Sequence, residues 1–323
     1  MELRRREVGK ARNPKLALAV SNPEPATPVV PKTFRWLCNQ YTASPEFKRL
    51  DPRTQRIRKR HLDKSCLEPT EPGAKTLFAD FPLSRMTSRA IRVLRDRKAD
   101  TPEAANDRLK AIRQAFKYGI EADLHDANPA RDVPYFDSEN EDGIHAWTLE
   151  EVQKYEGRWP IGSKARLALA LLLYTAQRRS DVVKFGQKDI HDGWLRFTQF
   201  KGRKRKPVTM ELPVVRPLRE IIDATPGVGI KTFLVTDFGK PFSDAGFGNK
   251  FRTWCDAAGL PQCSAHGVRK ATSAKLAELG CSDREIMSVT GHRTTKEVTR
   301  YTRSARQKIL ASRAMKKLDR ASK

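Results

Sequence analysis

The chain has 323 residues, enough for two domains that each bury a core, and its 63 Lys and Arg against 38 Asp and Glu give a net charge of +25. Such an excess of positive charge favours a polyanionic partner, above all a nucleic acid. No apolar run is long enough to span a bilayer and no secretory signal follows the basic N-terminus, so membrane and secreted classes are excluded and a cytoplasmic protein is expected.

The first part of the chain predicts a basic arm followed by a small helical domain. Residues 1–31 contain five prolines and little apolar periodicity, which is typical of a mobile segment. Apolar residues then recur at helical spacing through residues 32–135, with strongly basic segments at 54–67 and 87–97. A longer helix is expected to begin after Thr101, which we predict to cap a helix whose first residue is proline.

A linker and a second domain follow. Residues 136–147 include the acidic run DSENEDG and predict the linker. Thr148 and Glu151 have the spacing of a capping box and open the second domain, residues 148–323. Its most apolar segment, residues 163–176, predicts a buried helix.

The remainder of the second domain predicts one β-hairpin among helices. Two β-prone runs, 194–200 and 207–212, flank a basic turn at 201–206. Helices are expected over 214–224, 243–258, 265–279, 282–290 and, at the C-terminus, 304–318.

The cysteine and histidine patterns give no sign of a metal site, a cofactor site or a disulfide. The five cysteines form no C-x-x-C pair, and no histidine stands at zinc spacing from two of them. We therefore predict reduced structural thiols and treat the histidines outside the motifs below as surface residues. The cysteines are Cys38, Cys66, Cys255, Cys263 and Cys281, and these histidines are His61, His125, His145 and His191.

The second domain also holds the residue types that cut DNA by transesterification. The extra negative charge of the transition state must be met by fixed cations, and the arginine fork suits phosphate oxygens. The reaction further needs a nucleophile, a base and an acid for the leaving oxygen. The candidates are Arg178 in TAQRRSD, Lys201 at the hairpin turn, His266 and Arg269 three residues apart, His292 after Gly291, and Tyr301 nine residues beyond His292.

These boxes, in this order over about residues 148–305, resemble the tyrosine recombinases of the phage-integrase family. The resemblance implies that Arg178 and Arg269 clamp the scissile phosphate and that Asp181 braces Arg178. It implies that His266 accepts the proton of Tyr301 or bonds the phosphate, that His292 donates to a phosphate oxygen and that Lys201 protonates the leaving 5′-hydroxyl. Tyr301 then forms a 3′-phosphotyrosine without a metal.

The resemblance also implies an architecture and partners. The fold would be mainly α with a small antiparallel sheet: a SAM-like helical core-binding domain and an α+β catalytic domain that close on duplex DNA as a C-shaped clamp. A tetramer would act on two DNA sites, aided by accessory DNA-bending or directionality factors, to integrate or excise a prophage or genomic island. The helix 304–318 would dock on a neighbouring protomer or else pack on its own domain.

Several positions depart from the family pattern. Ala176 replaces a glycine, and Thr290 replaces the leucine of the L-G-H box. Arg179 adjoins Arg178, and two further lysines, Lys204 and Lys206, share the hairpin turn with Lys201.

Phosphate contacts are expected from basic residues of both domains, which fix position without reading sequence. Three other functions fit the same residues: a type IB topoisomerase, a resolvase of chromosome or plasmid dimers, and a DNA-binding regulator that has lost activity. The phosphate-contacting candidates are Arg53, Arg56, Arg58, Lys59, Arg60, Arg85, Arg89, Arg92, Arg203 and Lys204.

Overall fold

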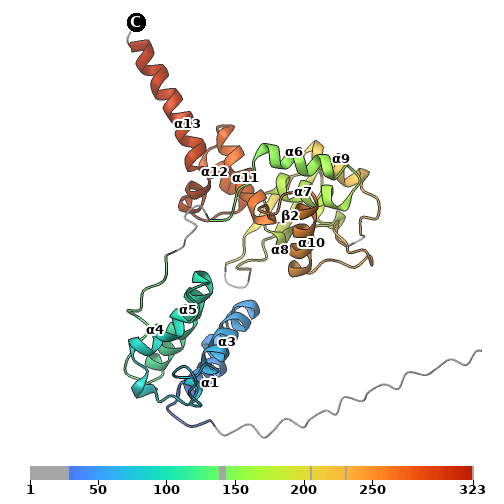
Figure 1. Ribbon diagram of the computed structural model, residues 1–323. Helices are drawn as coiled ribbons and strands as arrows, with labels where there is room; N and C mark the ends of the chain where they lie inside the picture. Colours follow the sequence, from blue (N-terminus) through green and yellow to red (C-terminus); the bar gives the residue numbers. More distant parts are fainter. Residues whose placement is uncertain (1–28, 138–142, 204–205, 230, 322–323) are drawn as a thin grey trace, which may run out of the picture. The chain divides into compact units, whose positions relative to one another are not determined.

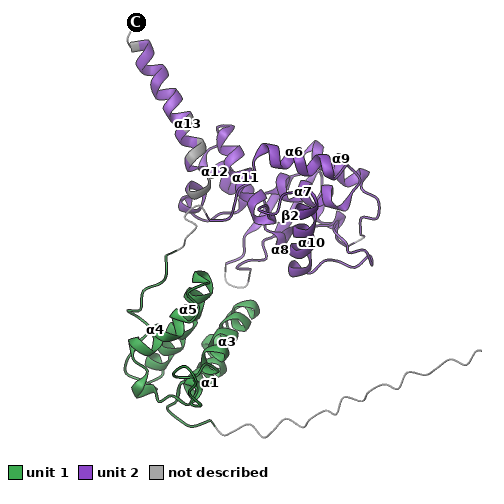
Figure 2. Ribbon diagram, viewed as in Figure 1, with its two compact units in different colours: residues 1–138 green, residues 139–323 purple. Residues whose placement is uncertain are grey.

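The computed structural model describes residues 29–137, 143–203, 206–229 and 231–321, and the chain divides into two compact units. Unit 1 comprises residues 1–138 and unit 2 residues 139–323 (Figure 2). The boundary lies inside the linker predicted at 136–147, of which residues 138–142 lie outside the described part. The predicted N-terminal arm also lies outside it, apart from its last three residues.

Unit 1 is all-helical in its described residues, as the sequence predicts. Four longer helices are joined by one short α-helix and two 3-10 turns. The elements are α1 (Phe34–Ala43), α2 (Pro45–Lys48), α3 (Pro52–Cys66), η1 (Phe78–Asp80), η2 (Leu83–Arg85), α4 (Ser88–Asp96) and α5 (Pro102–Glu121).

Helix α5 is the centre of unit 1, and it packs against α1, α3 and α4. Its apolar residues at helical spacing, Leu109, Ile112 and Phe116 among them, are at most 1% exposed. The buried guanidinium of Arg108 on the same helix pairs with Glu68 at 2.6 Å, so its charge is not left unpaired in the core.

The prediction that the Thr101 side chain caps α5 was wrong. Thr101 stands at the N-cap, but it has φ −136° and ψ 75° and its side chain makes no capping hydrogen bond. Its hydroxyl donates instead to the carbonyl of Lys98, at 3.4 Å. Proline at the first helical position, whose missing N–H needs no partner, remains as the start signal.

Unit 2 holds the three-stranded sheet and the remaining helices (Figure 1). The elements are α6 (Leu149–Arg158), α7 (Lys164–Thr175), α8 (Arg179–Val182), η3 (Gln187–Asp189), β1 (Ile190–His191), β2 (Trp194–Thr198), β3 (Thr209–Pro213), α9 (Arg216–Ala224), α10 (Asp244–Ala257), α11 (Ala265–Glu278), α12 (Asp283–Thr290) and α13 (Thr295–Ala321).

The core of unit 2 is built around α7, which is apolar on all sides. Every residue from 167 to 172 is at most 2% exposed, and α9, α10 and α11 pack around the helix. Ser163 caps its start, and Ala176 ends it in the left-handed conformation with φ 51°. A left-handed alanine is strained, so tertiary contacts must hold this turn.

The sheet has the order β1-β2-β3 and is antiparallel throughout. β2 and β3 form the predicted hairpin, in which Leu195 pairs with Leu212 and Phe197 with Met210. Alternate residues of these strands face the core, which fixes the register. The sequence did not reveal β1, because two residues are too short for a periodic signal.

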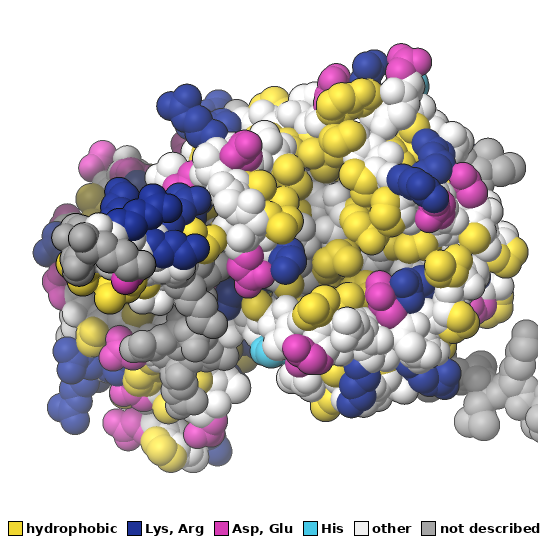
Figure 3. Space-filling model, turned by 90° about the horizontal axis from the view of Figure 1, so that it is seen from above, with side chains coloured by type: hydrophobic (Ala, Val, Ile, Leu, Met, Phe, Trp, Pro, Cys, Tyr) yellow, Lys and Arg dark blue, Asp and Glu magenta, His cyan; other side chains and the backbone are white. Residues whose placement is uncertain are grey.

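The C-terminal helix is longer than predicted. The sequence predicted a helix over 304–318, whereas α13 begins at Thr295 and so includes residue 301. Its first half packs on α11 and α12, while residues 310–320 are exposed and project from the unit (Figure 1). Figure 3, viewed from that side, shows its largest group of Lys and Arg at one end, smaller basic groups elsewhere, and many hydrophobic side chains over the middle of the face. No helix among the described residues is long and apolar enough to cross a membrane.

Candidate active site

An open pocket of about 430 Å³ in unit 2 brings three of the sequence motifs together. The TAQRRSD segment, the hairpin turn and the segment after α12 all contribute to its wall. The lining side chains that carry charge are Arg178, Lys201, Lys206, Arg293 and Glu297. Four of these five are cations, so the pocket suits an anionic group.

Arg178 is held at the start of α8, directly after the left-handed turn that ends α7. Its side chain is half-buried, and Nη1 donates to Oε1 of Gln199 at 3.3 Å. The neighbouring Arg179 instead pairs with Asp244 of α10, with Nε 2.8 Å from the carboxylate. These contacts favour Arg178 as the arginine that serves the pocket.

Arg269 is the most deeply buried cation of the site, with 1% of its surface exposed. It stands on α11, whose start is capped by the side chain of Ser264. Its Nη1 donates to the carbonyl oxygens of Ala176 and Thr290 at 2.7 and 2.8 Å. A single guanidinium nitrogen thus ties together the ends of α7 and α12.

His266 lies one turn before Arg269 on α11 and is half-buried. Burial lowers the pKa of its imidazole, and the positive charges of Arg269, Arg178 and Lys201 lower it further. The imidazole is therefore neutral at pH 7, the form that accepts a proton.

His292 follows the left-handed Gly291 that ends α12 and is 7% exposed. Burial and then the charge of Arg269 lower its pKa to about 4. Its Nδ1 lies 2.9 Å from the hydroxyl of Thr290. This histidine too is neutral at pH 7 in the DNA-free protein.

Asp181 makes a hydrogen bond to the hairpin turn. Its Oδ1 accepts the backbone N–H of Phe200 at 2.6 Å, directly before Lys201. Burial raises the pKa of this carboxyl, while the Phe200 hydrogen bond and the charge of Arg178 act in the opposite direction. The expected bracing of Arg178 stays a prediction, and the hydrogen bond of Asp181 is with the turn that presents the lysine.

The basic turn itself packs on an aromatic ring. The guanidinium of Arg203 lies 3.5 Å from the ring centroid of Phe200, and Nζ of Lys184 lies 3.4 Å from the same centroid. Lys201 and Arg203 are both exposed. Lys204, predicted to contact phosphate, lies outside the described residues.

A buried amide network, which sequence reasoning missed, connects the motifs behind the pocket. Nε2 of Gln199 donates to Oε1 of Gln177 at 2.7 Å and to the carbonyl of Thr290 at 2.9 Å. Gln177 in turn donates to the carbonyls of Thr175 and Val289. Both glutamines are at most 2% exposed, so the network is fully desolvated and fixes the relative positions of α7, the hairpin and α12.

Tyr301 lies within α13, but its side chain lies outside the described part of the structure, so its role as nucleophile stays a prediction. The same helix packs through Val298 and Thr302, both fully buried. Helix α13 contacts α11, which carries Arg269, and α12, which precedes His292.

The basic candidates of unit 1 lie mainly on two helices. Arg53, Arg56, Lys59 and Arg60 are exposed on α3, and Arg89 and Arg92 are exposed on α4, with Arg85 just before it. Arg58 is half-buried, because its Nη1 donates to the hydroxyl of Tyr41 at 2.7 Å. Lys59 of the same helix also has a structural contact, an ion pair of 2.8 Å with Asp63.

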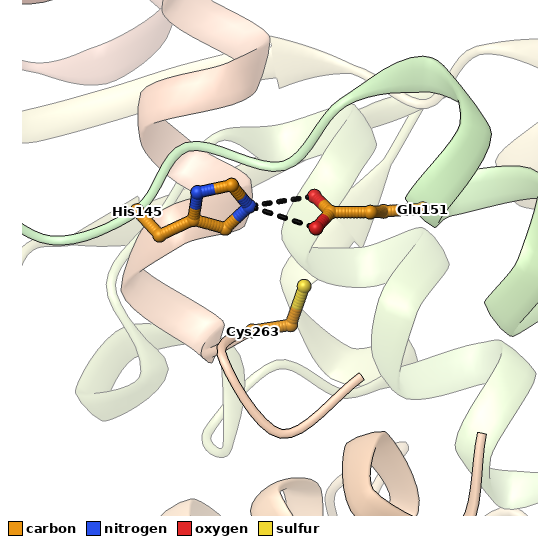
Figure 4. A group of neighbouring side chains, drawn as sticks. All are labelled: His145, Glu151 and Cys263. Atoms are coloured by element: carbon orange, nitrogen blue, oxygen red, sulfur yellow. Dashed lines mark hydrogen bonds and ion pairs between the residues drawn. The ribbon is translucent and has the colours of Figure 1, made fainter. Parts of the chain in front are cut away.

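One group of side chains among the described residues has the donor types of a metal site: His145, Glu151 and Cys263 (Figure 4). Their donor atoms lie within 4.8 Å of one another. The glutamate oxygens already accept hydrogen bonds from Thr148 N–H, Gln262 and Nε2 of His145. These hydrogen bonds extend the capping box of Thr148 and Glu151, and His145 takes part in it as an exposed residue, as the sequence predicts.

This chain is similar to known integrases. Residues 149–308, about half of the chain, match the model of the Phage integrase family. The integrase of Mycobacterium phage D29 is 23% identical over 247 residues, which cover 70% of this chain and 65% of that protein. The virulence plasmid integrase pGP8-D of Chlamydia muridarum is 32% identical over 169 residues, which cover 49% and 47%. The chain spans less than two thirds of the length of either relative.

Solved structures agree on the fold. A lambda integrase tetramer bound to a Holliday junction superposes with a TM-score of 0.69 at 19% identity, covering 83% of this chain and 77% of that one. The Tn1549 transposon integrase in complex with transposon right end DNA gives a TM-score of 0.67 at 14% identity, covering 86% and 99%. At this identity the likeness establishes a helical region followed by an integrase-type catalytic fold.

Proposed function

Because residues 149–308 make the chain a member of the phage integrase family, we propose that it is a site-specific DNA recombinase that cuts and rejoins strands through a 3′-phosphotyrosine at Tyr301. The single observation that carries the proposal is the convergence of the predicted cations. Arg178 and Lys201 come from distant segments yet line one pocket, and Arg269 donates to the carbonyl of Thr290, the residue before the pocket-lining Gly291.

The proposed chemistry assigns each group one task. Arg178 and Arg269 bind the nonbridging oxygens of the scissile phosphate, where charge grows in the transition state. The hydroxyl oxygen of Tyr301 attacks phosphorus and its proton passes to neutral His266. The bond to the 5′-oxygen breaks, and that oxygen takes a proton from Lys201.

The cation cluster also explains how a tyrosine can act as a nucleophile near neutral pH. A free tyrosine has a pKa near ~10, and nearby positive charge stabilises the phenolate. The phosphotyrosyl bond keeps the energy of the broken linkage, so the 5′-hydroxyl of a second strand can reverse the attack. Strand exchange then needs no external energy source.

The proposed partner is duplex DNA held by both units, which would close on it as a clamp. The exposed arginines and lysine of α3 and α4 offer phosphate contacts from unit 1. The exposed Leu310, Met315 and Leu318 of α13 offer an apolar stripe to a neighbouring protomer in a tetramer on two sites. The biological role would be integration or excision of a prophage or genomic island in the bacterial cytoplasm.

The test is a search for the covalent intermediate. The protein is incubated with labelled duplexes that tile the DNA around its own gene, and SDS-resistant adducts are separated on denaturing gels. We expect one duplex to give an adduct whose protein linkage maps to a 3′-phosphate. Strand transfer between two such duplexes distinguishes a recombinase from a topoisomerase, which relaxes supercoils without exchanging partners.

A matched pair of variants assigns the nucleophile. Tyr301→Phe should abolish the adduct and leave DNA affinity unchanged, since only one hydroxyl is lost. Tyr174→Phe removes the hydroxyl of a half-buried tyrosine elsewhere in unit 2 and should leave the adduct intact. An adduct that persists in Tyr301→Phe contradicts the assignment.

A further inference from the structure

Thr290 stands where the family pattern has leucine, and it is the polar centre of the site. It is fully buried as the last residue of α12. Its carbonyl accepts hydrogen bonds from Arg269 and Gln199. Its hydroxyl lies 2.7 Å from the carbonyl of Ile286 and 2.9 Å from Nδ1 of His292.

The two hydroxyl contacts determine where the protons lie. A threonine hydroxyl has one hydrogen, and the Ile286 carbonyl can only accept. At 2.7 Å the hydroxyl must therefore donate to Ile286, because otherwise two oxygen lone pairs would face each other with no proton between them. The hydroxyl can then only accept from the His292 ring, so Nδ1 of His292 carries a hydrogen.

We infer that Thr290 is a positioning residue that fixes His292 as the Nδ1–H tautomer and leaves the lone pair of Nε2 as the acceptor of the ring. The inference deepens the proposed function, on which its catalytic meaning rests. Which nitrogen of a neutral histidine carries the proton is set by the partner of the other nitrogen. In a chain with leucine at position 290 no hydroxyl would impose this choice.

The tautomer has a consequence for phosphate binding. A phosphate oxygen and an unprotonated Nε2 are both hydrogen-bond acceptors. His292 therefore cannot donate to the scissile phosphate until Nε2 gains a proton from solvent. The groups that act on His292 are Arg269, Arg178 and His266, which oppose its protonation, and Glu297 of α13, which favours it. The arriving phosphate adds a negative charge, so the site takes up a proton as it engages DNA.

The tautomer can be read in the DNA-free protein by long-range ¹H–¹⁵N correlation spectra of ¹⁵N-histidine-labelled protein, with His292→Asn to assign the signal. Wild type and Thr290→Ser, which keeps the hydroxyl, should show Nδ1 as the protonated nitrogen. Thr290→Val, which keeps the shape, should lose that pattern. Protonated Nε2 in the neutral ring of wild type overturns the inference, and so does an unchanged tautomer in Thr290→Val.

The proton uptake is tested by the pH dependence of adduct formation. The rate ratio of Thr290→Val to wild type should rise with pH, by up to about tenfold per pH unit, because only wild type needs an added proton on His292. A ratio independent of pH overturns the uptake, and circular dichroism checks that each variant is folded. The spectra are recorded without DNA, so they test the role of Thr290 independently of cleavage. A failure to cleave any duplex counts against the proposed function alone. A wrong tautomer counts against the role of Thr290 alone.

Discussion

Replacing Gln199 with leucine tests whether the buried amide network holds the site together. Leucine has a similar volume but removes both donors and the acceptor. Gln177 then loses the donor to its Oε1, which costs about 1–3 kcal/mol for a buried acceptor left unpaired. The Thr290 carbonyl keeps Arg269, so losing its second donor costs only about 0.5–1.5 kcal/mol.

Together these losses amount to roughly 2–4 kcal/mol of the free energy of unfolding, part of which the buried leucine offsets. For a unit of this size each kcal/mol lowers Tm by roughly 2–4 °C, so Tm should fall by about 4–16 °C before the contribution of the leucine is subtracted. Arg178 also loses its acceptor on Oε1, and an arginine that is no longer fixed stabilises the transition state less. Adduct formation should therefore slow by at least about tenfold.

The measurements are thermal unfolding by circular dichroism, adduct formation at saturating DNA, and DNA affinity. Gln187→Leu makes the same change at an exposed position and serves as the control. We expect DNA affinity to be unchanged in both variants, because most phosphate contacts lie elsewhere. If Gln199→Leu unfolds within about 1 °C of the control and cleaves at the wild-type rate, the network does not position the site.

Four further outcomes are expected. Arg178→Ala should slow adduct formation by about 10²–10³ while the protein stays folded, as measured by gel assay and circular dichroism. Gly291→Ala should lower Tm, because φ is +69° there and a Cβ would overlap the Gln199 amide. His292 has a folded pKa of about 4, below its ordinary value, so the unfolded chain binds the proton more readily. Stability present above about pH 6.5 should therefore fall by about 2–3 kcal/mol as pH drops towards about 4, and chemical denaturation should show a smaller loss in His292→Gln. Among the five thiols, Cys281 should react first with iodoacetamide in the native protein, by mass spectrometry, because the other four are buried.

Local chemistry explains what could be predicted from the sequence. The capping boxes at Thr148 and Ser282 satisfy N–H groups within four residues, so their signal is complete in the sequence itself. The apolar run of α7 and the alternation in β2 and β3 are equally local. Apart from the C-terminal helix, the predicted helices and hairpin of unit 2 therefore lie within a few residues of the observed ones.

What could not be predicted depends on distant partners. The hydrogen bonds of Gln199 reach residues 177 and 290, and no pattern around position 199 announces either. Arg269 was predicted as a phosphate ligand, yet its two backbone acceptors lie far away in the sequence. The early start of α13 at Thr295 also depends on distant residues. Packing of Val298 on neighbouring helices stabilises a polar first turn that helix propensity alone does not favour.

The position of Arg269 also explains how so many cations can lie together before any DNA is bound. The carbonyls of Ala176 and Thr290 belong to the C-terminal turns of α7 and α12, where the aligned peptide dipoles place partial negative charge. Two helix ends thus act as a built-in counter-anion for the innermost arginine. The protein carries part of the phosphate's electrostatic role within its own backbone, so the positive cluster is preformed and need not be assembled by the substrate.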